Sequence, residues 1–238
     1  MSIGLTPALQ SSQRCLQAFA AKAPEALLPI LRSPIFYKSV ALLFGVRIFS
    51  IVTRWIRQRP WKAEGELAII TGGSSGIGRQ IVQDLVKLRV KVVILDTKEP
   101  QSDLSSGVFF YKVDITSSKH VNDVAQRIAT EHGYPTILIN NAGVAVEGTI
   151  LDKDEKDIRL TMEVNTLSHF WTVKAFLPSM VEKNHGHIIT IASIASFVSM
   201  GEAVDYGCSK AAALAFHEGL TQEVKHWYKA NNVRTRYI

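Results

Sequence analysis

The segment "ELAIITGGSSGIGRQIVQDLVKL", residues 66–88, decides the fold that the sequence predicts. It opens with a short apolar run at 67–70 and continues through a cluster of glycines and serines. Apolar residues then recur at helical spacing, at Ile77, Ile81, Val82, Leu85 and Leu88. This order predicts a strand, a glycine-rich turn and a helix.

The glycine-rich turn predicts a phosphate-binding site. Gly72, Gly76 and Gly78 carry no side chain, so the backbone can approach a pyrophosphate closely. The helix that follows directs free N–H groups and the positive end of its dipole at the anion. No Lys-Ser/Thr pair follows the last glycine, which excludes the phosphate-loop NTPase pattern.

An acidic residue at the end of the second predicted strand bears on the choice of cofactor. The strand "KVVILD" covers 91–96 and ends in Asp96. An acid about 20 residues after a glycine turn suits the ribose 2′-hydroxyl of NAD and repels the 2′-phosphate of NADP. Asp96 therefore favours NAD. Lys98 keeps NADP open, because its side chain can fold back toward a phosphate.

Predicted strands and helices alternate along the rest of the chain. Strands at 108–115 and 136–143 flank a helix at 117–133, which starts with a serine and ends with a glycine. The link between Asp96 and the third strand has room only for a loop, and the charged residues 152–157 predict the solvated start of a long helix. The alternation predicts an α/β fold with a doubly wound, parallel, Rossmann-type sheet. The ligand is expected at the C-terminal ends of the strands.

A leader precedes this domain. Residues 1–62 hold nine Lys or Arg and one acid, whereas residues 63–238 are nearly neutral. The stretch "SVALLFGVRIFSIVT", 39–53, predicts a membrane-associated helix at about 39–56. Because Arg47 interrupts it, we expect a short tilted span or an in-plane anchor. A helix packed on the domain and a mitochondrial presequence are the alternatives.

Composition argues against two further classes of protein. The net charge of +6 comes from the leader, whereas a nucleic-acid-binding domain carries its basic stripe on the folded body. Cys15 and Cys208 are far apart, and they form neither a disulfide framework nor metal-ligand spacing. We therefore expect no nucleic-acid partner and no metal.

Four motifs, in this order, make the sequence similar to a known family. They are "TGGSSGIG" (71–78), "NNAG" (140–143), Ser193 at the end of "HIITIAS", and "YGCSK" (206–210). Over roughly residues 64–235 the chain resembles the short-chain dehydrogenase/reductase family. The stretch "VDYGCSKAAALAFHEGLTQEV" and the hydrophobic leader most resemble its membrane-associated branch, which contains retinol and 17β-hydroxysteroid dehydrogenases.

The resemblance implies catalytic roles for four residues. Tyr206 is the acid/base at the substrate oxygen. Lys210, one helical turn away on the same face, stabilises the Tyr206 phenolate and holds the nicotinamide ribose. Ser193 donates a hydrogen bond to the substrate oxygen. Asn165, in "EVNTLSHFW", holds a water that links Lys210 to solvent.

The resemblance also implies which residues bind the cofactor, NAD or NADP. Asp114 reaches the adenine edge, and the residues after the fourth strand line the adenosine side. Asn140 is interpreted as a structural residue instead. The cofactor-binding residues predicted in this way are Gly72, Ser74, Ser75, Gly76, Ile77, Gly78, Asp96, Asp114, Asn141, Ala142, Gly143, Tyr206 and Lys210.

The function implied is an oxidoreductase that transfers a hydride between nicotinamide and a lipophilic alcohol or ketone. Retinoids, steroids and fatty alcohols are the expected substrate classes. The expected location is a membrane surface or lipid droplet, on the cytosolic face of the endoplasmic reticulum, with the mitochondrion as the alternative. A homodimer is left open as a further partner.

The end of the sequence leads to an alternative function. The last residues, "NNVRTRYI", only begin the sixth strand, so the sheet is expected to miss its last strand or strands. The fifth strand and the helix that carries Tyr206 would then lack neighbours. The alternative is therefore a truncated, catalytically impaired nucleotide-binding protein that serves as a membrane or partner scaffold.

Overall fold

The computed structural model describes residues 62–101 and 103–238, together with positions 33, 36, 40, 42, 45 and 46. The chain divides into two compact units, 1–61 and 62–238. Most of the membrane-associated helix expected at 39–56 lies outside the described residues. Within the part of the chain that is described, no helix has the length and apolarity needed to cross a bilayer.

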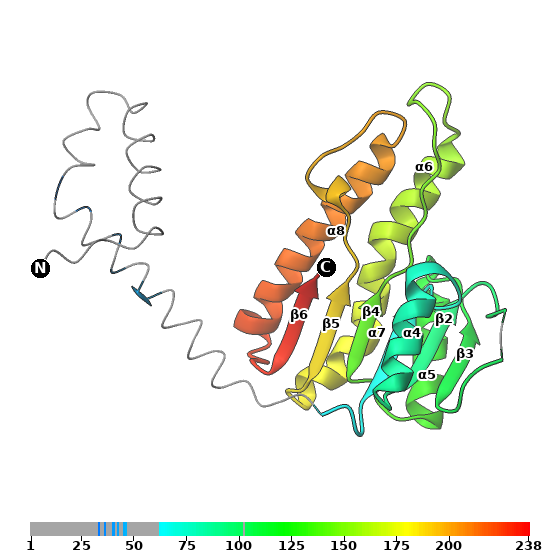
Figure 1. Cartoon of the computed structure of the whole chain (residues 1–238), viewed down its shortest axis with the longest axis vertical. Coiled ribbons are helices and arrows are strands. Elements are labelled where there is room, and N and C mark those ends of the chain that lie inside the picture. The colour runs from blue at the N-terminus through cyan, green and yellow to red at the C-terminus, as the bar shows by residue number, and fades with distance from the viewer. Residues whose placement is uncertain are drawn as a thin grey trace, which may run out of the picture. The chain divides into compact units, whose positions relative to one another are not determined.

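The second unit is built on a six-stranded sheet in the order β3-β2-β1-β4-β5-β6, with every neighbouring pair parallel (Figure 1). The strands are β1 (Leu67–Thr71), β2 (Lys91–Asp96), β3 (Val108–Lys112), β4 (Ile137–Asn140), β5 (Gly186–Thr190) and β6 (Val233–Tyr237). The third and fourth strands are shorter than predicted, because the chain leaves the sheet after Lys112 and Asn140. The strand order reverses between β1 and β4, where a ligand crevice opens in sheets of this kind.

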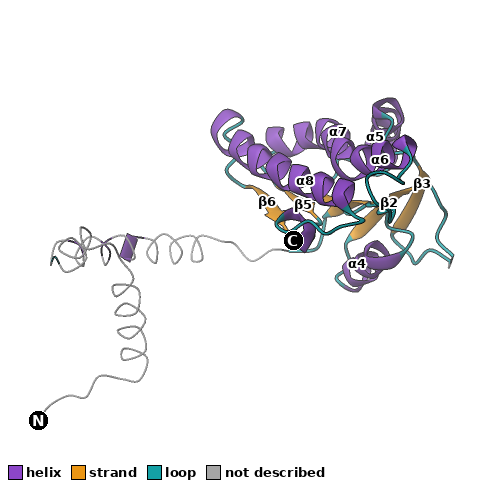
Figure 2. Ribbon diagram, turned by 90° about the horizontal axis from the view of Figure 1, so that it is seen from above, coloured by secondary structure: helices purple, strands orange, loops and turns teal. Residues whose placement is uncertain are grey.

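Helices cover both faces of the sheet (Figure 2). The long helices are α4 (Gly76–Lys87) on one face and α5 (Ser118–Glu131), α7 (Ser168–Glu182) and α8 (Val204–Gln222) on the other. The shorter elements are α6 (Glu155–Met162), the π-helical turns η2 (Glu163–Leu167) and η4 (Glu223–Trp227), and the 3-10 turn η3 (Ile194–Ser196). Because α6, η2 and α7 follow one another directly, the helix predicted to begin within 152–157 starts at Glu155.

The core lies on both faces of the sheet, because successive strand residues point to opposite sides. Leu67 and Ile69 of β1 belong to the cluster beneath α5, α7 and α8. Ala68 and Ile70 belong to the cluster that includes Val82 of α4. The central strand β1 and the middle of β2 are therefore apolar on both sides, as in other parallel sheets with two covered faces.

The expectation that the fifth strand and the Tyr206 helix lack neighbours was wrong. All five residues of β5 pair in register with β6, from Gly186 with Val233 to Thr190 with Tyr237. Strand β6 also contacts α8, through a hydrogen bond between the hydroxyls of Thr221 and Thr235 at 2.8 Å. The physical reason is that β5 has only five residues, so residues 233–237 suffice to cover its edge.

Candidate active site

The glycine-rich turn between β1 and α4 has the geometry of an anion-binding site. Gly72 has a φ angle of 67°, and a Cβ at Gly78 would lie 2.1 Å from the carbonyl oxygen of Gly72. Ser75 at the start of α4 makes no side-chain capping bond, and the first turn holds no acid. Ser75, Gly76 and Ile77 are exposed, so the first N–H groups of α4 are accessible to a phosphate.

Asp96 lies beside this turn. Its carboxylate accepts hydrogen bonds from the backbone N–H groups of Ser74 and Lys98, both at 3.1 Å. Because a carboxylate has about four acceptor positions, a ribose hydroxyl can still donate to Asp96. The Ser74 hydroxyl is buried and has no hydrogen-bond partner among the residues that the structure describes.

Asp114 lies beyond the end of β3, the strand next to β2. Its Oδ1 accepts hydrogen bonds from the backbone N–H (3.0 Å) and the hydroxyl (2.7 Å) of Thr116. The side chain is exposed and therefore open to an adenine, but the contacts that it makes serve the turn before α5.

Asn141 connects the segment after β4 to the glycine turn. Its Nδ2 donates to the carbonyl oxygens of Thr71 (2.9 Å) and Gly72 (3.1 Å). The Thr71 hydroxyl accepts from the backbone N–H groups of Asn141 and Ala142, both at 3.0 Å. Asn140 is buried and accepts a side-chain hydrogen bond from α7. These bonds hold the segment after β4 against the glycine-rich turn.

Asn165 is buried in the π-helical turn η2. Its Oδ1 accepts from the backbone N–H of Val144, and its Nδ2 donates to the Val144 carbonyl, both at 2.8 Å. The second Nδ2 hydrogen bond goes to the Ser209 hydroxyl at 3.0 Å. Because both amide hydrogens are used, the side chain can offer a water only the remaining acceptor position on Oδ1. The water relay stays a prediction, and the contacts observed tie the segment after Gly143 to α8.

Lys210 is a buried cation that links these motifs. It is 4% exposed, and burial lowers the pKa of its ammonium. Its Nζ donates to the Ile191 carbonyl at 3.0 Å and lies 5.8 Å from the centroid of the Tyr206 ring. A Cβ built on Gly143 would lie 3.7 Å from this Nζ. An ammonium has three donors, so Lys210 keeps donors for a ribose or a phenolate.

Tyr206 and Ser193 are the remaining catalytic candidates. Tyr206 lies half-buried in the first turn of α8, and its backbone carbonyl accepts from the Ser209 hydroxyl at 2.7 Å. Ser193 follows β5, and its hydroxyl oxygen accepts from the backbone N–H of Ala195 at 3.1 Å. Because that bond occupies an acceptor position, the hydroxyl hydrogen of Ser193 can donate to a substrate oxygen.

The family of this chain is shown by a sequence match that covers all six strands of the sheet. Residues 66–238 match the family described as short chain dehydrogenase. The chain belongs to this family. All the predicted site residues, from Gly72 to Lys210, lie within the matched range.

Curated relatives of this short-chain dehydrogenase include fungal and human proteins. Dehydrogenase RED2 of Cochliobolus heterostrophus is 40% identical over 237 residues, which cover 93% of this chain and 89% of RED2. Human estradiol 17-beta-dehydrogenase 11 is 38% identical over 191 residues, 77% of this chain and 64% of that protein. Human 17-beta-hydroxysteroid dehydrogenase 13 is 36% identical over 184 residues, 74% of this chain. The chain therefore spans less than two thirds of the two human relatives, covering 64% and 61% of their lengths.

Solved structures resemble this short-chain dehydrogenase in fold. A short-chain dehydrogenase from Leptospira borgpetersenii, with bound NAD+, gives a TM-score of 0.66 at 25% identity. The comparison covers 72% of this chain and 69% of that one. The short-chain dehydrogenase from Streptomyces avermitilis gives a TM-score of 0.67, also at 25% identity, over 72% of this chain and 64% of that one.

Tyr237 is a residue near the site that the sequence did not single out. It lies on β6, and its hydroxyl contacts the Ser196 hydroxyl and donates to the backbone carbonyl of Lys210 at 3.4 Å. Burial raises the pKa of this phenol. Strand β6 therefore supports both the turn after Ser193 and the helix that carries Lys210. No local pattern in "VRTRYI" could have revealed these contacts.

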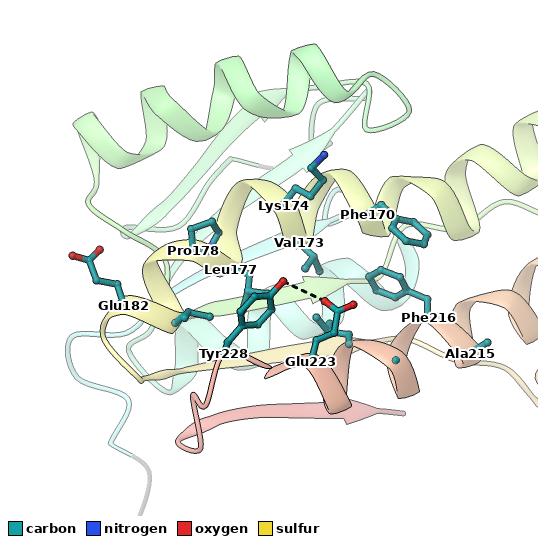
Figure 3. Close-up of a pocket in the computed structure, with 13 residues that line it drawn as sticks. Phe170, Val173, Lys174, Leu177, Pro178, Glu182, Ala215, Phe216, Glu223 and Tyr228 are labelled. Atoms are coloured by element: carbon teal, nitrogen blue, oxygen red, sulfur yellow. Dashed lines mark hydrogen bonds between the residues drawn. The ribbon is translucent and has the colours of Figure 1, made fainter. Parts of the chain in front are cut away.

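A separate apolar pocket of this short-chain dehydrogenase is lined mainly by residues of α7 and α8. A cavity of about 690 Å³ opens between α7 and α8, and Phe170, Val173 and Phe216 are among the residues that line it (Figure 3). The Tyr228 hydroxyl donates to the Glu223 carboxylate at 3.2 Å beside it. None of the predicted site residues lines this cavity, so it is not part of the candidate active site.

Proposed function

We propose that this short-chain dehydrogenase transfers a hydride between a nicotinamide cofactor and a lipophilic alcohol or ketone. The observation that carries the proposal is the position of the Lys210 ammonium. It lies beside Gly143, in the motif tied to the glycine turn, and within 5.8 Å of the Tyr206 ring centroid. One buried cation thus serves both a dinucleotide-binding segment and a phenol that can exchange a proton.

The residues present fit a dinucleotide. Gly78 leaves no space for a side chain beside Gly72, so the first turn of α4 lies directly against the strand end. Its accessible N–H groups suit a pyrophosphate, and the Asp96 carboxylate suits a ribose hydroxyl. When bound, the nicotinamide would supply the hydride acceptor or donor. Asp96 supports NAD over NADP, because its negative charge opposes a 2′-phosphate.

The chain's own residues would move the proton. Tyr206 would take the proton from an alcohol substrate, or return it to a ketone, at the substrate oxygen. The positive charge of Lys210 would stabilise the phenolate form of Tyr206. Ser193 would hold the same substrate oxygen through its available hydroxyl hydrogen.

A lipophilic substrate is supported by two observations. The names of the human relatives refer to estradiol and to a hydroxysteroid. In this chain the segment after Ser193 carries apolar side chains that are at least 61% exposed, namely Ile194, Phe197, Val198 and Met200. We propose a membrane or lipid-droplet surface, reached through the basic, apolar leader, as the source of such a substrate.

The proposed function is tested with the full-length chain, NAD or NADP, and a panel of retinoid, steroid and fatty alcohols. Turnover is followed as absorbance at the reduced-nicotinamide band. Oxidation of at least one lipophilic alcohol, with NAD preferred, is the expected result. Saturable nucleotide binding without turnover of any alcohol or ketone would contradict it and favour the scaffold.

Substitution of Asp96 by asparagine tests the cofactor preference. Asn keeps one acceptor for the amide of Ser74 or Lys98 but loses the charge. A hydrogen bond to a charged group contributes about 1.5–3 kcal/mol, so NAD affinity is expected to fall by roughly 10-fold or more while NADP affinity rises. The measurement is the ratio of the dissociation constants for NADH and NADPH. Asp103→Asn is the control, because Asp103 is an exposed acid in the loop that follows β2. An unchanged ratio in Asp96→Asn would contradict the assignment.

A further inference from the structure

Lys153 and Asp205 form a buried ion pair that the proposed chemistry does not use. The Lys153 Nζ lies 2.5 Å from Asp205 Oδ1, and the two side chains are only 3% and 6% exposed. The same Nζ donates to the Val146 carbonyl at 2.5 Å. The other ion pairs of lysine or arginine in the described part of the chain have side chains that are at least 45% exposed. This pair is therefore buried, whereas the other pairs lie on the surface.

The pair joins two segments that belong to the candidate site. Lys153 lies in the connection from β4 to α6, which begins with Asn141, Ala142 and Gly143. Asp205 lies in the first turn of α8, immediately before Tyr206. The two segments lie at the same end of the unit 62–238 (Figure 1). A hydrogen bond from the backbone N–H of Gly148 to the Glu202 carbonyl, 2.9 Å, links them a second time.

The start of α8 lacks a side-chain cap of its own. The first N–H groups of a helix have no partners within the helix, and ends without a cap fray. Ala203, at the N-cap position of α8, provides no side-chain capping bond. Tyr206 lies in this first turn, so its hydroxyl moves if the turn frays. The Asp205 carboxylate also places a negative charge at the positive end of the helix dipole.

The electrostatics of the pair agree with a fixed contact. Burial opposes ionisation of Asp205, but the Lys153 ammonium, the Tyr206 backbone N–H and the nearby Thr161 hydroxyl together keep its pKa below the ordinary value. Asp205 is therefore ionised at neutral pH. Removing either partner leaves an uncompensated charge in a buried place, which is strongly unfavourable.

We infer that Lys153 and Asp205 are positioning residues, which hold the first turn of α8, and with it the Tyr206 hydroxyl, against the segment that follows Gly143. This inference rests on the proposed function. Asn141 and Ala142 are held separately by Thr71, so loss of the pair should leave nucleotide binding almost intact. The expected signature is a fall in kcat with little change in KM.

The test compares the full-length chain with Lys153→Met. Amide hydrogen exchange at 207–210, whose N–H groups bond to the carbonyls of the first turn of α8, is expected to accelerate at least ~10-fold, while exchange in α4 stays unchanged. Because a misplacement of about 1 Å can lower a rate about 100-fold, kcat is expected to fall by about 10- to 100-fold. KM and the NADH dissociation constant should change less than about threefold. Lys156→Met, which removes an exposed pair with Asp154 (76% and 66% exposed), is the matched control and should change none of these.

If Lys153→Met does not fold, the same measurements are made on Asp205→Asn. This variant keeps the shape of the Asp205 side chain and one hydrogen-bond acceptor for Lys153. Unchanged exchange at 207–210, unchanged kcat, or exchange that accelerates equally in α4 would overturn the inference. If the intact chain turns over no substrate, the proposed function fails, and exchange at 207–210 alone decides whether the pair holds the first turn of α8. Faster exchange there supports the inference that Lys153 and Asp205 hold the first turn of α8. Unchanged exchange overturns that inference.

Discussion

Replacing Tyr206 with phenylalanine is expected to lower kcat by about 10²- to 10⁴-fold, the contribution that a positioned acid/base makes. The substitution removes one hydroxyl and keeps the ring. That hydroxyl has no hydrogen-bond partner among the residues described, so its loss should not unfold the protein. NADH binding is expected to change less than about threefold, because the Tyr206 ring and all the other predicted cofactor-binding residues are kept. The measurement is steady-state turnover beside a fluorescence titration of NADH.

Tyr134→Phe is the matched control for this prediction. Tyr134 is 58% exposed, and its ring lies under the Lys183 ammonium at 5.0 Å, a contact that phenylalanine keeps. The control should retain full turnover. Turnover by Tyr206→Phe within about threefold of the unmodified chain would remove Tyr206 from the acid/base role.

The second large effect is expected at Gly78. A Cβ at this position would lie 2.1 Å from the Gly72 carbonyl oxygen and 2.6 Å from Asn141 Nδ2, so Gly78→Ala must push α4 away from the end of β1. Overpacking of this kind lowers the free energy of unfolding by about 1–3 kcal/mol. The first turn of α4 moves with the helix, so NADH affinity is expected to fall by at least ~10-fold. Denaturant unfolding and NADH titration measure the two effects.

Gly219→Ala is the control for the glycine prediction. A Cβ there meets no atom within 4 Å, and the residue lies inside α8. Alanine is favoured over glycine in a helix by about 1 kcal/mol, so this variant should be slightly stabilised and bind NADH normally. Equal NADH affinity in Gly78→Ala and Gly219→Ala would mean that the turn does not hold the cofactor.

The nucleotide half of the fold could be predicted because its signals are local. Glycines between an apolar run and a helical apolar spacing predict β1, the turn and α4 whatever surrounds them. The register of β1 with β2 then places the end of β2, with Asp96, beside that turn. Ser117, predicted to start a helix, accepts the N–H of His120 as its cap at 3.3 Å.

Features that depend on distant contacts could not be predicted in the same way. The pairing of β6 with β5 depends on the lengths of two strands that lie far apart in the sequence. The fifth strand was expected to be uncovered, but all five of its residues pair with β6. Asn165 was singled out, but nothing local indicates that a π-helical turn would direct its amide to Val144 and Ser209. The contact of Lys153 with Asp205 joins positions 52 residues apart, beyond the reach of any periodic pattern.

The transfer of an isotope tests the central claim most directly. The full-length chain is incubated with NAD and a lipophilic alcohol that carries deuterium on the carbinol carbon, and the reduced nicotinamide is analysed by mass spectrometry. Direct hydride transfer predicts that the deuterium appears in the reduced nicotinamide, and that Tyr206→Phe slows its appearance. Saturable NAD binding with no labelled product from any retinoid, steroid or fatty alcohol would contradict the account.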